Sequence, residues 1–458
     1  MNWLKAFRSK KRSKKVEPQR IPRAEHIVSR TQFTQGTLRT LYGLKDAGFE
    51  AYVVGGGVRD LLAGGTPKDF DIATNAHPDE IRQVFRNCRL VGRRFMIAHV
   101  RWGREILEVT TFRGAITDSH ERDDTGRILS DNEYGTLETD AFRRDFTVNA
   151  LYYDIRDFSI VDYVGGLEDM QKKVIRLIGD PELRYREDPV RMLRAVRIAS
   201  KLGFSIEAKT AAPIPVLASL LREIPPARLF DEIVKLLQSR DGLANLEGLR
   251  HYGLLKHLLP MTDRAMADAR SMEFIRLALT NTADRLGNEQ TVSPAFLYAA
   301  LLWPAVDQGY RKLSAREGHH PNVALNQAAE AVLAQALAHV SIPKRFSLPM
   351  REIWQLQPRF EQRSGARAKR LMTHPRFRAA YDFLLLRASV GEVPQALADW
   401  WTKAQDGVTL PPVTALDVEI EATDGESLPA APKKKRRRRG GRRRGAGSAP
   451  AGGPSSGE

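Results

Sequence analysis

The apolar and polar positions of the chain follow two different periods. Between residues 51 and 165, short segments are either wholly apolar or alternate apolar with polar side chains, which is typical of β-strands. These segments are AYVVGG, FDIAT, RFMIAHVRW, EILEVTTF, FTVNALYYD and FSIVDYVGG. Leu38, Leu41 and Leu44 recur at helical spacing, so a helix is expected before the first strand. The pattern predicts a region of mixed helix and strand.

From about Pro181 onward the strand signals stop and helical periodicity takes over. The amphipathic or buried segments include DPVRMLRAVRIASKLGF, PPARLFDEIVKLLQS, NLEGLRHYGLLKHLL, PAFLYAALLW and PRFRAAYDFLLLRASV. The expected fold class is therefore α+β, with a small mixed-sheet head followed by an all-α neck and body. The expected divisions are a basic arm (1–30), a head (31–178), a neck (179–250), a body (251–405) and a linker with a basic tail (406–458).

The net charge of +17 is concentrated in two basic segments. Residues 433–458 carry +9 and residues 1–20 carry +7, which leaves +1 for residues 21–432. The Gly, Ala, Pro and Ser residues around the terminal arginines cannot bury enough apolar surface to fold, so basic, disordered termini are expected. Dense arginine favours binding to phosphate groups over a role in solubility alone.

Cysteine content and hydropathy limit the compartment in which the protein works. The single cysteine, Cys88, permits no internal disulfide, and no segment reaches the roughly 20 apolar residues of a membrane span. The basic start of the chain has no apolar segment behind it and so does not resemble a secretory signal. A cytoplasmic protein without a membrane span is expected.

A glycine-rich turn followed by two carboxylates is the first candidate for chemistry. In VGGGVRDLLAGGTPKDFDIAT, Gly55 and Gly56 lack a Cβ and would let backbone N–H groups approach a polyanion. Asp69 and Asp71 are two residues apart, so in a strand both would face one side and repel unless a cation lay between them. Two Mg²⁺ ions would there activate a hydroxyl and neutralise a leaving pyrophosphate. The plainer interpretation of Asp-x-Asp alone is a polar turn.

Further charged residues extend this candidate site. Asp145 lies in RRDFTVNALYY, where Arg143 and Arg144 could bind a triphosphate while Asp145 lies near the metals. A structural ion pair is the alternative for one of the two arginines. Glu108 in EILEVTTF is a candidate third carboxylate, although an exposed strand glutamate explains it equally well.

The segment YREDPVRMLRAVRIASKLGF suggests how a base could be selected. Asp188 is expected as the N-cap and Pro189 as the first residue of a helix, which places Asp188, Arg191 and Arg194 along one side. Adenine and cytosine present an amino donor beside a ring-nitrogen acceptor, whereas guanine and uracil present an oxygen acceptor beside an N–H donor. Asp188 accepts and Arg191 donates, so the pair would fit A or C. A helix-capping cluster of ion pairs is the structural alternative.

GGGVRDLL, DFDIAT, RRDFTVNALYY and REDPVRMLRAVRIASKLGF occur in the order in which they resemble the motifs of the class II nucleotidyltransferases. This family contains bacterial poly(A) polymerases and CCA-adding enzymes. The resemblance implies Mg²⁺ dependence and nucleotide addition to RNA 3′ ends, with catalytic Asp69, Asp71 and Asp145 and base-selecting Glu187, Asp188 and Arg191. The other expected nucleotide-binding residues are Gly55, Gly56, Arg59, Arg143, Arg144 and Arg194.

Within this family, the sequence favours the poly(A) polymerase branch. RLVGRRFMIAHV, IPPARLFDEIVKLL and HPRFRAAYDFLLLRA resemble that branch, and two basic arms suit an enzyme that accepts many RNAs. The expected reaction is template-independent addition of AMP from ATP, which promotes bacterial RNA turnover. RNA 3′ ends and ATP are the expected partners, and proteins of RNA decay could bind the basic arms. The alternatives are a CCA-adding enzyme and a catalytically idle RNA-binding protein.

Overall fold

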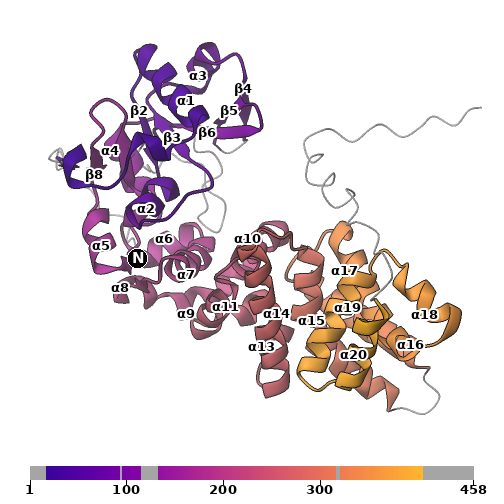
Figure 1. Cartoon of the computed structure of the whole chain (residues 1–458). Coiled ribbons are helices and arrows are strands. Elements are labelled where there is room, and N and C mark those ends of the chain that lie inside the picture. Colours follow the sequence, from indigo (N-terminus) through magenta and orange to yellow (C-terminus); the bar gives the residue numbers. More distant parts are fainter. Residues whose placement is uncertain (1–16, 93–94, 115–132, 316–319, 406–458) are drawn as a thin grey trace, which may run out of the picture. The chain divides into compact units, whose positions relative to one another are not determined.

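The computed structural model describes residues 17–92, 95–114, 133–315 and 320–405. Figure 1 shows the strands in the N-terminal part and helices through the rest. The elements up to residue 175 are β1 (Gln19–Ile21), η2 (Arg23–Glu25), η3 (Arg30–Gln32), α1 (Gln35–Asp46), β2 (Ala51–Val54), α2 (Gly56–Leu62), β3 (Asp71–Thr74), α3 (Pro78–Val84), β4 (Cys88–Val91), β5 (Ile97–Trp102), β6 (Glu105–Thr111), α4 (Leu137–Arg143), η4 (Thr147–Asn149), β7 (Leu151–Asp154), β8 (Ile160–Asp162), α5 (Gly166–Lys172) and β9 (Val174–Ile175).

The remaining elements are almost entirely helical. They are α6 (Pro181–Glu187), α7 (Val190–Leu202), β10 (Ser205–Ile206), α8 (Ala208–Ala211), α9 (Ile214–Leu217), η5 (Ala218–Glu223), α10 (Pro226–Leu237), α11 (Gly242–His251), α12 (Leu255–Leu258), α13 (Pro260–Ala265), α14 (Ala269–Gly287), α15 (Pro294–Ser314), α16 (Pro321–Leu337), α17 (Lys344–Leu356), η6 (Gln357–Glu361), α18 (Gly365–Met372), α19 (Phe377–Ser389) and α20 (Gln395–Ala404). The predicted fold class, a mixed-sheet head followed by a helical neck and body, is confirmed.

The head is built on an eight-stranded sheet of order β1-β8-β7-β2-β3-β6-β5-β4. Its strands pair antiparallel except for β3 and β6, which pair in parallel. Each strand segment predicted from the sequence contains a strand, whereas β1 and β4 were not predicted. The expectation that strands end before Pro181 is wrong in one place, because β10 pairs in parallel with β9. This pairing ties the chain after α7 back to the end of the head.

The two faces of the sheet are covered by different helices. Val53, Ile72 and Val109 share one apolar core with residues of α1, α2 and α3. The opposite face carries Tyr52, Val54, Ala73 and Tyr152, which pack with residues of α4. Because side chains alternate along a strand, Asp71 lies on the same face as Ala73. The candidate site is thus on the α4 face.

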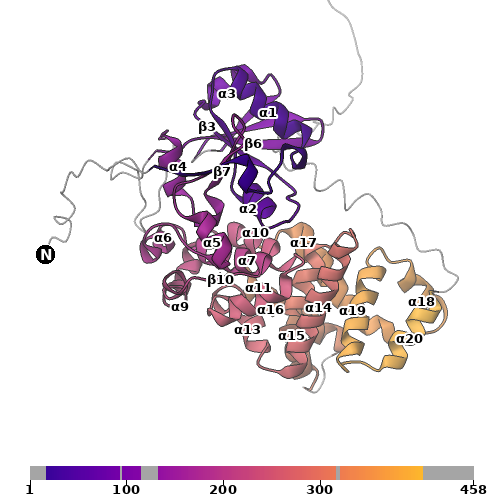
Figure 2. The ribbon, with the colours of Figure 1, turned by 60° about the vertical axis from the view of Figure 1, so that its left-hand side comes forward.

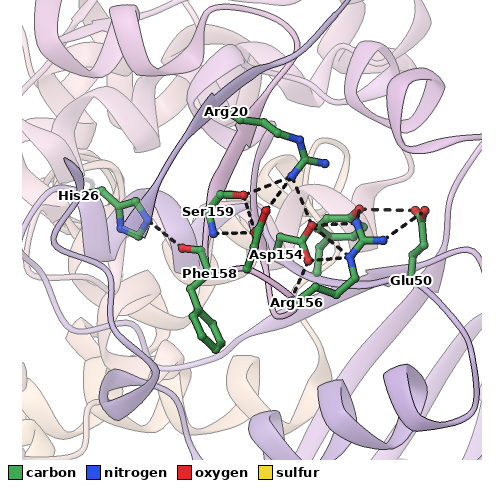
Figure 3. Close-up of polar contacts among 9 residues, drawn as sticks. Arg20, His26, Glu50, Asp154, Arg156, Phe158 and Ser159 are labelled. Atoms are coloured by element: carbon green, nitrogen blue, oxygen red, sulfur yellow. Dashed lines mark hydrogen bonds and ion pairs between the residues drawn. The ribbon is translucent and has the colours of Figure 1, made fainter. Parts of the chain in front are cut away.

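The N-terminal edge of the sheet begins earlier than the sequence suggests. β1 pairs antiparallel with β8, and Arg20 Nη1 lies 3.5 Å from Asp154 Oδ2. Figure 3 shows Asp154 between Arg20 and Arg156, whose Nη2 lies 2.8 Å from Asp154 Oδ2. Asp154 is buried, so the two arginines provide its counter-charge. Residues 19–21 therefore form the edge strand of the sheet, and the boundary of the basic arm at residue 30 stays a prediction.

Figures 1 and 2 show that the chain after the head consists almost entirely of helices. A single large core joins residues from α7 to α19 and includes Trp303 and Trp354. The described residues up to 405 fall in one compact unit, so the boundaries at 178, 250 and 405 remain predictions. Within the described part of the chain, no helix is both long and apolar enough to cross a membrane. The predicted disorder of the termini concerns residues 1–16 and 406–458, which lie outside the described residues.

Candidate active site

The two carboxylates of the aspartate pair lie at the start of β3. Asp71 is its first residue, whereas Asp69 precedes the strand, so strand alternation does not by itself place Asp69. Desolvation raises the pKa of Asp71, and the neighbouring charges of Glu108 and Asp69 raise it further. Neither aspartate side chain forms a hydrogen bond or ion pair with another described residue. The pair is therefore a concentration of negative charge that no cation of the described residues binds directly.

Glu108 lies beside this pair on the neighbouring strand. The Cα atoms of Asp71 and Glu108 are register partners in the parallel β3–β6 ladder. His99 on β5 is the register partner of Glu108 on its other side, and His99 Nε2 lies 3.8 Å from Glu108 Oε1. Among the described residues, no three His, Cys, Asp or Glu side chains are close enough to form a complete metal site. The site thus offers an aspartate pair with Glu108 as a neighbour.

The glycine turn before α2 lies beside the aspartate pair. Gly55 precedes α2 with φ 78°, a conformation that L side chains rarely adopt. A Cβ on Gly55 would lie 3.6 Å from Arg144 Nη1 and 3.7 Å from Asp71 Oδ2. Gly56 is the first residue of α2, which has only seven residues. The absence of a side chain at Gly55 keeps the space between Arg144 and Asp71 open.

The structure separates the roles of the two adjacent arginines. Arg144 donates from Nη2 to Asp140 Oδ2 at 2.9 Å and from Nε to Tyr152 Oη at 2.9 Å. No described residue accepts a hydrogen bond from its Nη1, the nitrogen that faces Gly55. Arg143 instead donates from Nη1 to the Gly114 carbonyl at 2.9 Å and is buried. Arg144 is therefore the arginine directed at the aspartate pair.

Asp140 holds Arg144 in this direction. Its side chain is 2% exposed and also accepts a hydrogen bond of 2.7 Å from Tyr152 Oη. Burial would raise the pKa of Asp140, but Arg144 and Arg113 outweigh this effect and lower it to about 2. The sequence reading missed Asp140 and Tyr152. The available signal was the i, i+4 spacing of Asp140 and Arg144 on α4.

Asp145 is bound on both of its oxygens. Oδ2 accepts from Arg194 Nε at 2.7 Å, and Oδ1 accepts from Asn149 Nδ2 at 3.0 Å. Burial opposes the charged form, but Arg194 and these hydrogen bonds prevail and the pKa of Asp145 is lowered. Asn149 Oδ1 accepts from Arg59 Nη1 at 2.6 Å. Asn149, also missed in the sequence, thus connects the Arg59 of α2 with the Asp145–Arg194 pair.

The residues expected to read the base are each held by a different partner. Arg191 Nη1 lies 3.0 Å from Glu187 Oε2, and Asp188 Oδ2 lies 2.8 Å from Arg228 Nη2 on α10. Asp188 and Arg191 therefore do not pair with each other. The helix also begins one residue later than predicted, at Val190, although Val190 N still donates to Asp188 Oδ1 at 3.3 Å. Arg228 was not identified from the sequence.

The chain is similar to known proteins over most of its length. Three family models match: the poly A polymerase head domain (residues 51–176), the probable RNA and SrmB-binding site of polymerase A (203–266) and the polymerase A arginine-rich C-terminus (317–444). The chain is 50% identical over 396 residues to Poly(A) polymerase I of Salmonella typhi, covering 84% of this chain and 85% of that protein. A CCA-adding enzyme of Lactobacillus helveticus is 42% identical over 200 residues, but these cover only 43% of this chain and 48% of that protein.

The fold has a solved counterpart over most of its length. The structure of the Bacillus stearothermophilus CCA-adding enzyme in complex with CTP matches with a TM-score of 0.54 and 27% identity, covering 87% of this chain and 89% of that chain. The sheet, the aspartate pair and the helical neck define a class II nucleotidyltransferase. Within that class, the chain belongs to the bacterial poly(A) polymerase family. The resemblance noted from the sequence motifs is confirmed.

Proposed function

We propose that the protein transfers AMP from ATP to RNA 3′ ends without a template, releases pyrophosphate and so promotes bacterial RNA turnover. The observation that carries this choice is the extent of the likeness to Poly(A) polymerase I. That likeness covers 84% of the chain, whereas the likeness to a CCA-adding enzyme covers 43%. The likeness to Poly(A) polymerase I thus extends over about twice as much of the chain.

Mg²⁺ fits the aspartate pair as a cofactor. Asp69 and Asp71 supply two carboxylates without a hydrogen-bond or ion-pair partner among the described residues, and the pKa of Asp71 is raised by desolvation and by the charges of Glu108 and Asp69. These two residues would hold the metal, with Glu108 as a candidate third carboxylate and with substrate phosphates and water as further oxygen ligands. When bound, Mg²⁺ would favour ionisation of the RNA 3′ hydroxyl and neutralise the leaving pyrophosphate.

The chain's own side chains would position the triphosphate. Arg144 offers Nη1 beside Gly55 and Asp71, while Asp140 and Tyr152 hold the rest of its guanidinium. Arg59 is fixed by Asn149 and Asp60 next to the same turn. Asp145 would act mainly by holding Arg194, since both of its carboxylate oxygens already have protein partners. We therefore assign the triphosphate role to Arg144 rather than Arg143.

Base selection would use Asp188 as the acceptor and Arg191 as the donor. Glu187 orients Arg191, and Arg228 orients Asp188, so the two groups keep separate positions. An adenine edge, with a donor beside an acceptor, matches this order, and guanine or uracil mismatches it. Cytosine matches as well, so Asp188 and Arg191 alone do not separate ATP from CTP.

A primer-extension experiment tests the function. The purified protein receives an unstructured RNA primer, Mg²⁺ and one nucleotide at a time. We expect a long ladder with ATP, limited addition with CTP, and very little with GTP or UTP. A protein that ignores this primer but adds a short C-C-A to tRNA lacking its end would be a CCA-adding enzyme. RNA binding without any addition would identify the idle binding protein.

RNA would be held along the body as well as at the site. Arg363, Arg367 and Arg370 on and next to α18 are exposed, and no described residue forms an ion pair with them. Such cations attract phosphates irrespective of sequence. We assign the reaction to the cytoplasm because a chain with one cysteine acting on ATP and RNA suits a reducing compartment. Protein partners in RNA decay remain part of this proposal.

A further inference from the structure

On one face of the head sheet, the apolar core does not extend over the outer strands β4, β5 and β6. Toward α1–α3, these strands contribute Leu90, Val100 and Val109 to the core on that side. On the opposite face, the core that contains α4 takes its strand residues from β2, β3, β7 and β8. In Figure 1, α4 lies near β8, whereas β4 and β5 lie at the other side of the head. The α4 face of β4–β6 is therefore a sheet surface outside both cores.

Residues on this surface are aligned with the aspartate pair. Glu108 on β6 is the register partner both of Asp71 on β3 and of His99 on β5. His99 is in turn the partner of Arg89 on β4, the edge strand of the sheet. Neighbouring strands lie about 4.8 Å apart, so the backbone of Arg89 is about 14 Å from that of Asp71. One row of side chains thus connects the candidate active site with the edge of the sheet.

A second cation lies next to this row. Arg101 on β5 is the register partner of Ile106 on β6. Because side chains alternate along a strand, both lie on the same face as His99. Ile106 is 46% exposed. The surface therefore combines an arginine with an apolar side chain that the described residues leave largely uncovered.

The arginines of this surface are available to an anion. Arg89 and Arg101 are exposed, and neither side chain forms a hydrogen bond or ion pair with another described residue. Among the strand residues of this face of β4–β6, Glu108 is the only carboxylate, and it lies at the inner end beside Asp71. The outer part of the surface is therefore positively charged.

We propose that single-stranded RNA lies across this face of β4–β6, with its phosphates on Arg89 and Arg101 and its 3′ end at the aspartate pair. Charge complementarity favours a polyanion, and the surface is continuous with the carboxylates that would act on the 3′ hydroxyl. Arginine and histidine also offer planar groups on which unpaired bases of any sequence stack. This inference rests on the proposed function, because it takes an RNA 3′ hydroxyl as the acceptor.

The place assigned to the triphosphate supports this path for RNA. Gly55 directly follows β2, and Arg144 Nη1 lies beside it. β2 and β6 are the neighbours of β3 on its two sides. The attacking and leaving oxygens are in line during transfer, so the acceptor and the pyrophosphate lie on opposite sides of the reacting phosphate. A primer over β6 and a triphosphate near the end of β2 satisfy this requirement.

The test measures binding of a fluorescent, unstructured RNA whose 3′-deoxy end prevents extension. The full chain is compared with a double variant, Arg89→Gln with Arg101→Gln. We expect RNA affinity to fall by about tenfold and the slope of log affinity against log salt to fall by about two, because two phosphate contacts and their released counterions are lost. Affinity for ATP should equal that of the wild type.

Arg82→Gln is the matched control for the single variant Arg101→Gln. Arg82 is also exposed and has no ion pair with a described residue, but it lies on α3, which packs on the other face of the sheet. Its replacement removes the same charge from the head. We expect a smaller loss of RNA affinity in Arg82→Gln than in Arg101→Gln.

A set of modified RNAs locates the contacts along the strand. In each RNA, one phosphate is replaced by an uncharged methylphosphonate. The wild type should lose affinity when a phosphate near the 3′ end is replaced. The double variant should lose little more from the same replacement, because the two changes remove one and the same contact.

Three results would overturn the inference. Wild-type RNA affinity in the double variant would show that RNA does not cross this surface. An equal loss in Arg82→Gln and Arg101→Gln would assign the effect to overall charge. Sensitivity only to phosphates far from the 3′ end would separate the surface from the aspartate pair. If the double variant does not fold, Arg101→Gln decides by the same measurements. A protein that binds RNA through these arginines yet adds no AMP would contradict the proposed function and leave this inference standing.

Discussion

The head and the neck differ in whether their charged side chains form ion pairs within the protein. In the head, Asp69 and Asp71 have no hydrogen-bond or ion-pair partner among the described residues, and the pKa of Asp71 is raised by desolvation and by the charges of Glu108 and Asp69. In the neck, three of the four cations on one face of α7 are bound to carboxylates. The carboxylates in the head are therefore available to bind a cation, whereas the cationic side chains in the neck are already oriented by ion pairs.

This difference separates chemistry from recognition. A group that must meet a metal gains from being unpaired, because a protein partner would compete with the ion. A group that must read a base or guide a phosphate gains from being held, because orientation then costs less on binding. Substitutions in the head should consequently change the rate, and substitutions in the neck should change which nucleotide is bound.

The largest effect is expected from Asp71→Asn. Removing one carboxylate of the pair should lower kcat by about 10³-fold, because the metal supplies several kcal/mol of charge stabilisation and each ~1.4 kcal/mol corresponds to a factor of ten. Asp69→Asn should behave alike. Primer extension under saturating ATP measures the rate, and RNA binding is the control that should not change. Turnover at the wild-type rate in either variant would remove the metal pair from the mechanism.

A smaller effect is expected from Asp140→Asn, which tests whether the head also contains a group that must be held. Loss of the Asp140 charge frees Arg144, so KM for ATP should rise by about tenfold while kcat changes less. Tyr152→Phe removes only one hydrogen bond and should give a weaker shift in the same direction. An equal fall in kcat with KM unchanged would contradict a positioning role.

The same variant should alter acid stability. The pKa of Asp140 is about 2 in the folded protein against an ordinary value of 3.8. A carboxyl with a lowered folded-state pKa stabilises the fold above its unfolded pKa, and this contribution is lost as pH falls from about 4 toward 2. The loss amounts to about 2 kcal/mol for a buried group. The free energy of unfolding, measured between pH 5 and pH 2, should therefore fall less steeply with falling pH in Asp140→Asn than in the wild type.

The sequence predicted the strands of the head better than it predicted which charged side chains form ion pairs. The strands that contain Asp71 and Glu108 were predicted because the alternation of apolar and polar residues can be recognised within a short segment of sequence. The partners of Asp188 and Asp145 were not found, since Arg228 and Arg194 come from 40 and 49 residues away. Such contacts depend on how helices pack, which no local period encodes.

Base selectivity should change by a moderate amount in Arg191→Ala. The ratio of ATP to GTP incorporation should fall by about tenfold, because one matched hydrogen bond between buried groups contributes roughly 1–3 kcal/mol. Arg228→Leu should weaken the same ratio by releasing Asp188 from its partner. RNA affinity should stay constant in both variants. Unaltered nucleotide ratios would show that the base is read elsewhere.

The smallest effect concerns the body, where exposed cations without an ion-pair partner among the described residues would bind RNA phosphates and take no part in the reaction. Arg367→Gln on α18 should weaken RNA binding by only about threefold and lower the slope of log affinity against log salt by about one, because one phosphate contact and its released counterion are lost. Arg378→Gln is the matched control, since Arg378 is exposed but lies 3.1 Å from Asp382. Binding of a fluorescent RNA across a salt series measures both slopes. If the two variants give the same slope as the wild type, α18 does not follow the RNA backbone, and the division between an unpaired head and a paired neck has no counterpart in the body.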